Sequence, residues 1–205
     1  MPLRHLLYRC PTCGHEPVDG AGERVSCAAC RTRYRRSRRG ALVEVREASG
    51  ETCLEEARTL VDRLRELGGP LTAPTRGDAD LSYAAPALLG RSAGEDPVRH
   101  RGRLLGFCER GGPRSAGTAA VDVQALVFRS REGTEGRWPL LELGGVQVAS
   151  KALQVLPRGE PLVQLEFPDD SPLRWEELLH HLLREAYRRA GRGEVVEFQP
   201  RIRAR

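Results

Sequence analysis

The fold of this chain is decided near its N-terminus, where residues 10–30 read CPTCGHEPVDGAGERVSCAAC. This segment holds two Cys-x-x-Cys pairs, Cys10 with Cys13 and Cys27 with Cys30, and 13 residues separate the pairs. Two residues between cysteines let both thiolates of a tight turn reach one ion, and a second pair completes a tetrahedral shell of four sulfurs. The sequence therefore predicts a small zinc ribbon built around these four cysteines.

The predicted zinc site has a structural role. Four thiolates close the coordination shell, whereas a catalytic zinc keeps one position open for water or substrate. A pair of disulfides is the first alternative, but it is typical of secreted chains, and no apolar signal segment follows Met1. A thioredoxin-like redox pair is the second, but it needs no second Cys-x-x-Cys. His15 lies beside the first pair, and we expect it to be a surface residue.

The length of 205 residues fits one medium domain or two small ones. A ribbon of this size depends on its metal, so a second unit has to bury most of the apolar residues. No apolar run approaches the length that crosses a bilayer. We expect a cytoplasmic protein, with peripheral association with the inner membrane face as a further expectation.

The net charge of +5 is weak evidence about partners. Of the 33 basic residues, Lys151 is the only lysine and the rest are arginine. This bias is typical of a GC-rich bacterial genome, in which arginine serves wherever a cation is needed.

A local group of arginines is more informative than the total charge. Tyr34 is surrounded by Arg31, Arg33, Arg35, Arg36, Arg38 and Arg39, directly after the second cysteine pair. These residues are a candidate anion-binding site, because arginine binds phosphate and an aromatic ring stacks on bases. A solvated strand in an arginine-rich chain is the other interpretation.

The sequence divides into three predicted regions: a zinc ribbon (1–46), a helix with a Pro/Gly-rich linker (47–97), and a second domain (98–205). In the ribbon we expect strands over 3–8, 24–26 and 41–45. Thr52 and Glu55 form a capping box that predicts a helix ending before Gly68.

The second domain has a pattern of short strands followed by one helix. We expect strands over 103–108, 119–128, 138–143, 146–149, 153–156 and 162–167, spaced as in a small antiparallel barrel or sandwich. Ser171 is the expected N-cap of the last helix, with Pro172 at its first position and Gly191 after its end. His180 and His181 lie at the boundary of its apolar stripe. The fold class is α+β.

The last hundred residues resemble the pleckstrin-homology and GRAM-like family. The segments that carry the resemblance are Ala125-Leu126-Val127-Phe128, Trp138-Pro139-Leu140-Leu141-Glu142-Leu143, Gly145-Val146-Gln147-Val148, Leu165-Glu166-Phe167-Pro168 and Ser171-Pro172-Leu173-Arg174-Trp175-Glu176-Glu177-Leu178-Leu179. The resemblance implies an antiparallel barrel capped by the C-terminal helix, with Trp175 packed into the barrel mouth. It also implies a lipid-binding or protein-binding module, whose phosphate-binding loop would lie near 109–114.

The combination with a ribbon is similar to accessory regions that accompany some bacterial glycerophospholipid acyltransferases. The chain lacks their His-x-x-x-x-Asp motif. The resemblance therefore implies a setting in phospholipid metabolism and does not imply the transferase reaction.

We do not expect an enzyme. The chain contains no phosphate-binding loop of the G-x-x-x-x-G-K type. A site assembled from distant residues would need His100, His180, His181 and Cys108 to converge. We expect a non-enzymatic adaptor or regulatory protein that binds a protein or a membrane surface and has no small-molecule substrate. The alternative is a nucleic-acid-binding ribbon protein that uses the segment from Arg31 to Arg39.

Overall fold

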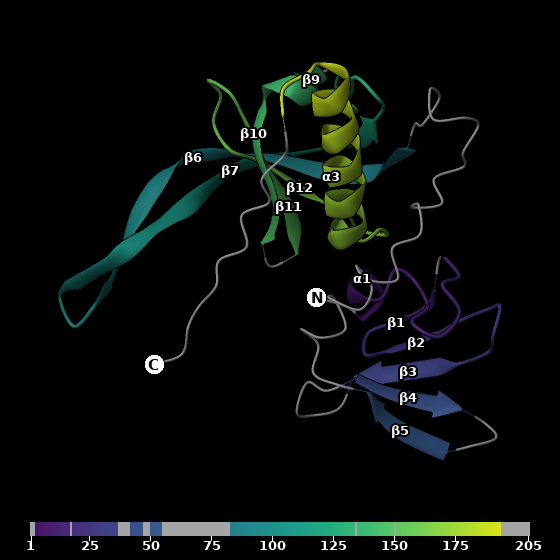
Figure 1. Cartoon of the computed structure of the whole chain (residues 1–205). Coiled ribbons are helices and arrows are strands. Elements are labelled where there is room, and N and C mark those ends of the chain that lie inside the picture. Colours follow the sequence, from purple (N-terminus) through teal and green to yellow (C-terminus); the bar gives the residue numbers. More distant parts are fainter. Residues whose placement is uncertain are drawn as a thin grey trace.

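The chain forms two antiparallel sheets and a long C-terminal helix (Figure 1). The computed structural model describes residues 3–16, 18–36, 42–46, 50–54, 83–133, 135–149 and 151–193, and at 42–46 and 50–54 it describes the backbone only. Among these residues, none of the helices is both long enough and apolar enough to span a bilayer.

The N-terminal sheet is a five-stranded antiparallel meander. Its strands are β1 (Asp19–Ala21), β2 (Arg24–Ser26), β3 (Arg33–Arg36), β4 (Leu42–Arg46) and β5 (Gly50–Leu54), in that spatial order. The expected strands at 24–26 and 41–45 are confirmed by β2 and β4. We call the described part of residues 3–54 the ribbon.

The strand that we expected over residues 3–8 is wrong, because this segment begins with a short helix, α1 (Leu3–Leu6). The amide of Leu7 donates to the carbonyl of Leu3 at 2.8 Å, and the amide of Leu3 donates to Gly22 at 2.7 Å. Leu3 and Leu7 are both buried in the ribbon core. A spacing of four residues places side chains on one face of a helix, so burial of this pair favours the helical turn.

The expected start of a helix at Thr52 is also wrong. Thr52 lies in β5 and pairs with Glu44 of β4. The edge of β4 offers backbone partners to this segment, and a complete ladder of hydrogen bonds outweighs a local capping signal. The rest of the predicted connecting helix, and residues 70–82 of the predicted linker, lie outside the described residues.

The second sheet has seven antiparallel strands in the order β10-β11-β12-β6-β7-β8-β9. Its strands are β6 (Tyr83–His100), β7 (Arg103–Val121), β8 (Ala125–Ser130), β9 (Glu135–Pro139), β10 (Leu143–Ala149), β11 (Ala152–Pro157) and β12 (Val163–Glu166). A four-strand meander is thus followed by a three-strand meander, and β12 joins the two by pairing with β6.

Three expectations about this region need correction. The strand that we expected over 138–143 is instead the end of β9, a 3-10 helix, η2 (Leu140–Glu142), and the start of β10. Residues 83–97, which we assigned to the linker, form most of β6, and the strand that we expected over 119–128 is the end of β7, a turn, and the start of β8. Pro86, one of the prolines that suggested a linker, pairs with Thr118 of β7 within this sheet. The division of the chain into domains at 46 and 97 stays a prediction.

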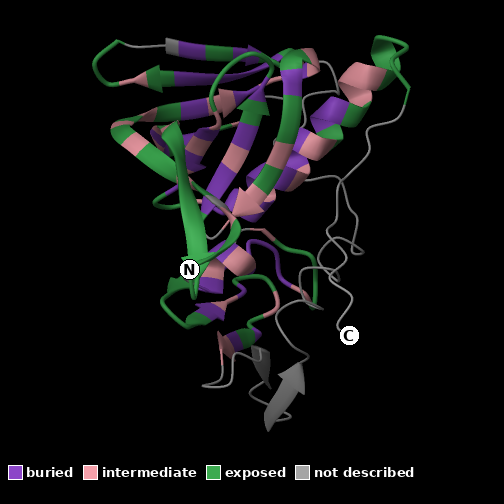
Figure 2. Cartoon of the chain, turned by 90° about the vertical axis from the view of Figure 1, so that its left-hand side faces the viewer, coloured by how far each residue is buried: buried purple, intermediate pink, exposed green. Residues whose placement is uncertain are grey.

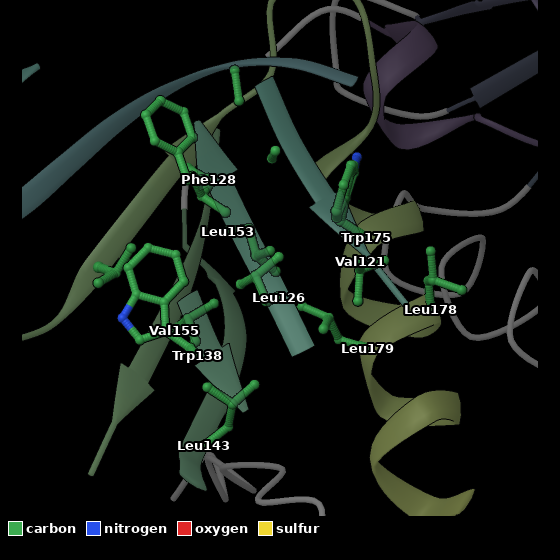
Figure 3. Packing of buried hydrophobic residues seen from close by; sticks show 14 of the residues in the cluster. Val121, Leu126, Phe128, Trp138, Leu143, Leu153, Val155, Trp175, Leu178 and Leu179 are labelled. Carbon is green, nitrogen blue, oxygen red and sulfur yellow. The ribbon is translucent and has the colours of Figure 1, made fainter. Parts of the chain in front are cut away.

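The C-terminal helix α3 (Pro172–Arg189) covers the core of the seven-stranded sheet (Figure 3). As expected, Ser171 is its N-cap and Pro172 its first residue, and Gly191 follows its C-cap with φ of 64°. Trp175 is fully buried and stacks on Phe167 with ring centroids 4.7 Å apart. Seven strands followed by a capping helix are the element order that the pleckstrin-homology resemblance implies. We call residues 83–193 the sheet module.

Asp170 organises the start of α3. Its carboxylate accepts hydrogen bonds from the Tyr83 hydroxyl at 2.6 Å, the Trp175 indole at 2.8 Å and the Ser171 amide at 2.7 Å. Its neighbour Asp169 is exposed and pairs with Arg4 at 3.1 Å. Both aspartates therefore have a structural role at the start of the helix.

Replacing Asp170 should therefore destabilise the fold much more than replacing Asp169. Asp170→Ala leaves the buried indole N–H of Trp175 without an acceptor, and we expect it to lower the free energy of unfolding by about 3 kcal/mol. Asp169→Ala removes one exposed ion pair and should cost less than about 1 kcal/mol. Urea unfolding of the two variants measures the difference. Equal losses would contradict this account of the start of α3.

Candidate functional site

The four predicted cysteines come together in the ribbon. Their sulfur atoms all lie within 4.8 Å of one another. The Sγ atoms of Cys10 and Cys30 are 3.6 Å apart, and so are those of Cys13 and Cys27. Cys10 and Cys27 are buried, Cys30 is half-buried, and Cys13 is exposed. The predicted cluster is confirmed, and we call it the cysteine cluster.

The two cysteine pairs sit in turns of the same geometry. In the first, the amide of Gly14 donates to the carbonyl of Cys10 at 2.8 Å, and the amide of Cys10 donates to His15 at 2.9 Å. In the second, Arg31 donates to Cys27 at 3.0 Å, and Cys27 donates to Thr32 at 2.9 Å. Gly14 and Arg31 both have positive φ angles, of 73° and 58°. Each turn therefore directs two sulfurs toward one point.

The cluster fits a tetrahedral metal ion. With metal–sulfur bonds of about 2.3 Å, the sulfurs of a tetrahedral site are separated by roughly 3.8 Å. The observed separation of 3.6 Å within the two close pairs agrees with this value and is far longer than a disulfide bond. His15 is exposed and is not part of the cluster.

Three hydroxyl side chains that the sequence did not indicate surround the cluster. The Tyr34 hydroxyl lies 3.2 Å from the sulfur of Cys10 and 2.7 Å from the hydroxyl of Thr12. The hydroxyl of Thr32 lies 3.2 Å from the sulfur of Cys30. Neighbouring hydrogen-bond partners orient metal ligands and tune their charge. The sequence offered one signal for the two threonines. Thr12 lies two positions after Cys10, and Thr32 lies two positions after Cys30.

The thiols differ in acidity. Desolvation opposes ionisation of Cys30, but hydrogen bonds with Thr32 and with neighbouring thiols outweigh it and lower its pKa to about 6. Burial raises the pKa of Cys10. Because a metal binds thiolates, occupation of the cluster has to displace the protons that remain.

The candidate anion site around Tyr34 is only partly supported. Tyr34 is 1% exposed and points into the ribbon core, so its ring is not open for stacking. Arg31 belongs to the second turn, and Arg36 pairs with Glu23 at 3.0 Å. Arg33 and Arg35 lie in β3, and Arg38 and Arg39 lie outside the described residues.

The sheet module carries a second candidate site, a long hairpin that projects from the sheet (Figure 1). β12 pairs with β6 only from Leu88 to Arg91, and β8 pairs with β7 only from Gly117 to Val121. The backbone of residues 93–115 therefore pairs only within the hairpin, and we call these residues the arm. At its base, the amide of Ser92 donates to Leu162 and the amide of Arg131 donates to Ala116. Register shifts near Ser92 and Val98 mark β-bulges, which bend and twist a strand.

The tip of the arm combines apolar and basic side chains. Val98, Leu104 and Leu105 are exposed by 42%, 45% and 65%. Arg101 and Gly102 form the two-residue turn with φ angles of 48° and 79°, as a type I′ hairpin requires. Arg99, Arg101 and Arg103 are exposed, and among the described residues none of the three forms an ion pair. In Figure 2, where the arm points toward the viewer, it is mostly in the colour of exposed residues.

The phosphate-binding loop that we expected near 109–114 is wrong. These residues lie within β7, and the connection between the first two strands of the module is the turn at Arg101 and Gly102. Arg110 forms an ion pair with Asp96 at 2.5 Å across the arm, and Arg114 pairs with Glu166 at 2.7 Å. The basic group at the connection is instead Arg99, Arg101 and Arg103.

The side chains that a scattered catalytic site would need lie on separate elements. His100 and Cys108 lie on the arm, which points away from α3 (Figure 1). On α3, His180 is half-buried with a ring nitrogen 3.3 Å from the Val146 carbonyl oxygen, and His181 is exposed. The boundary position that we expected for these two histidines is confirmed.

One sequence motif was overlooked: residues 90–94 read Gly-Arg-Ser-Ala-Gly, which matches G-x-S-x-G. In hydrolases this motif places the serine on a sharp turn between a strand and a helix. Here Ser92 lies inside β6, donates to Glu109 and accepts from the Gly94 amide at 3.3 Å. The motif therefore lacks the structural context of a nucleophile elbow.

Comparisons with known proteins give little further guidance. No family model matches the chain, and no curated protein matches it. A solved structure similar to it is the N-terminal PH domain of human ARAP2, determined in solution, with 13% sequence identity and a TM-score of 0.36. The match covers 64% of this chain and 98% of that domain. The strand order and the capping helix of the chain itself define its fold.

We expect removal of one cluster cysteine to abolish metal binding. Cys27→Ser takes a buried thiolate from the shell, whereas Cys108→Ser changes an exposed thiol on the arm and serves as the matched control. Elemental analysis of purified protein should find about one equivalent of metal in the control and none in Cys27→Ser. Equal metal content in both would show that the cluster is not the binding site.

Substitutions at the two positive-φ residues, Gly14 and Arg31, should have opposite effects on the free energy of unfolding. Gly14→Ala should lower the free energy of unfolding by about 1 kcal/mol, because a Cβ disfavours this conformation although space is free around it. Arg31→Gly should raise the free energy of unfolding by up to about 1 kcal/mol. Thermal unfolding of metal-loaded protein measures both. A destabilised Arg31→Gly would show that the Arg31 side chain contributes contacts beyond its backbone role.

Proposed function

We propose that this protein is a non-enzymatic, zinc-stabilised adaptor that binds an anionic membrane surface through the tip of its arm. The observation that carries the proposal is the combination, at one projecting turn, of three exposed apolar side chains with three arginines. An apolar group of this kind on a protruding hairpin is typical of interaction sites. The expected setting in phospholipid metabolism stays a prediction.

The metal in this proposal is zinc with a structural role. Four sulfurs in tetrahedral arrangement suit zinc or iron, and two Cys-x-x-Cys turns that close the shell are typical of structural zinc sites. The cysteines would supply all four ligands. Bound zinc would contribute folding energy to a ribbon whose own core is small.

Charge favours a lipid surface over a neutral partner. Each arginine near an anionic leaflet contributes about 1 kcal/mol of attraction, and this attraction weakens as salt is added. Leu104 and Leu105 lie beside these arginines in sequence, so they can enter the apolar boundary of the bilayer while the guanidinium groups remain at the phosphates. The arm holds both groups away from the rest of the sheet module (Figure 1).

Binding to lipid vesicles tests the proposal. We expect the protein to sediment with vesicles of phosphatidylcholine and phosphatidylglycerol at low salt, and to bind them less at 0.5 M salt. Leu105→Ser with Arg103→Ser should weaken this binding by about tenfold or more, since it removes one apolar anchor and one charge.

The chain offers a matched control for this experiment. Leu156→Ser with Arg158→Ser also changes one exposed leucine and one exposed arginine, but near the end of β11. This control should bind vesicles like the unchanged protein. Equal binding of both double variants, or no preference for anionic over neutral vesicles, would reject a membrane role for the tip and leave a protein surface as its partner.

The nucleic-acid alternative has less support. Its proposed stacking residue, Tyr34, is buried, and Arg36 is engaged by Glu23. Binding of DNA or RNA whose affinity falls steeply with salt, and falls further in Arg33→Ser with Arg35→Ser, would favour this alternative over the membrane proposal.

A further inference from the structure

The ribbon docks against the start of α3, and the contacts there form a continuous interface. The Arg4 guanidinium donates to the Pro168 carbonyl at 2.9 Å, and the Ser171 hydroxyl donates to the His5 carbonyl at 2.5 Å. The Tyr8 hydroxyl donates to the carboxylate of Glu177. Figure 1 shows α1 beside the first turn of α3. We call this set of contacts the docking interface.

The apolar part of the docking interface belongs to the ribbon core. Leu173, in the first turn of α3, is 9% exposed and packs in the cluster formed by Leu3, Leu7, Tyr8 and the buried cysteines. Val148 of β10 packs against the same cluster. The ribbon core is therefore incomplete without side chains from the sheet module.

Buried charges cross the interface as well. The carboxylate of Glu16 accepts from Arg9 at 2.6 Å and lies 3.5 Å from the guanidinium of Arg174. The side chains of Arg9, Glu16 and Arg174 are exposed by only 6%, 3% and 15%. Separating the two units would leave the Glu16 carboxylate with Arg9 but would remove Arg174, the cation that the sheet module supplies.

The residues that make these contacts flank the first cysteine pair. Tyr8 and Arg9 directly precede Cys10, and Glu16 follows Cys13 by three residues. Their relative positions are set by the turn, in which Cys10 donates to His15 and Gly14 donates to Cys10. A ribbon this small depends on a bound metal to hold such a turn. The metal therefore fixes one side of the docking interface.

We propose that metal binding by the cysteine cluster holds the ribbon docked on α3, so that loss of the metal releases the ribbon and uncovers the start of the helix. The coupling is reciprocal: docking on α3 tightens metal binding by the same factor by which the metal tightens docking. This inference goes beyond membrane binding and does not depend on it.

Tryptophan fluorescence can follow the release, because both tryptophans belong to the sheet module. Trp175 lies beside the docking interface and bonds to Asp170, whereas Trp138 lies on β9 and bonds to Glu160. In Trp138→Phe, zinc removal by a chelator should shift the emission of Trp175, and added zinc should restore it. In Trp175→Phe, the emission of Trp138 should not change.

A variant confined to α3 tests the reciprocal effect without altering the ribbon. Arg174→Ala with Glu177→Ala removes the partners that α3 offers to Glu16 and Tyr8. We expect it to weaken zinc binding about tenfold, within the roughly 5- to 150-fold range of typical coupling. Arg184→Ala with Glu185→Ala, further along the same helix, is the matched control and should leave zinc affinity unchanged. Competition with a chromogenic chelator measures both affinities.

Two outcomes would overturn the inference. One is complete zinc release with no change in Trp175 emission, and the other is equal zinc affinity in the two double variants. Retained vesicle binding in either case would show that the membrane proposal stands independently.

Discussion

The junction of Asp170 and Ser171 at the start of α3 ties both parts of the molecule together. Asp170 binds Tyr83 and Trp175 within the sheet module, and Ser171 both caps α3 and donates to the ribbon at His5. Two adjacent residues thus provide hydrogen-bond partners for the first turn of the helix, for the indole of Trp175 and for the N-terminal segment. The polar groups that these hydrogen bonds join are largely buried, and a buried polar group needs a hydrogen-bond partner. The positions of Asp170 and Ser171 relative to their partners are therefore narrowly fixed.

Small domains bury little apolar surface, and two features of the ribbon compensate for this. Its own core is a few leucines, two tyrosines, two valines and the buried cysteines, completed by Leu173 from α3. The cysteine cluster places four sulfurs where one metal ion could join them, and docking on α3 supplies apolar area and partners for buried charge. The proposed adaptor draws on this arrangement and on the arm, which carries the exposed apolar and basic side chains.

Sequence reasoning succeeded where a local pattern was sufficient. The spacing of four cysteines predicted the cluster, because a Cys-x-x-Cys turn needs no distant partner to direct its sulfurs. Ser171, Pro172 and Gly191 predicted the bounds of α3 for the same reason, since capping depends on the chain's own backbone. Local signals failed at Thr52, where β4 provides hydrogen-bond partners for a strand. They also failed at residues 83–97, where prolines concealed a strand that pairs with β7 and, from Leu88 to Arg91, also with β12.

The sequence by itself determined the cysteine cluster, the capping helix and the general order of short strands. The tertiary structure alone decided that Tyr34 is buried beside Cys10 instead of exposed for stacking, that Glu16 lies between Arg9 and Arg174, and that an arm projects from the sheet. The physical reason is that cysteine spacing and helix caps act over a few residues. Burial, buried charge pairs and the length over which a strand has a neighbour depend on segments that are distant in sequence, by 24 positions for Cys10 and Tyr34 and by more than a hundred for Glu16 and Arg174.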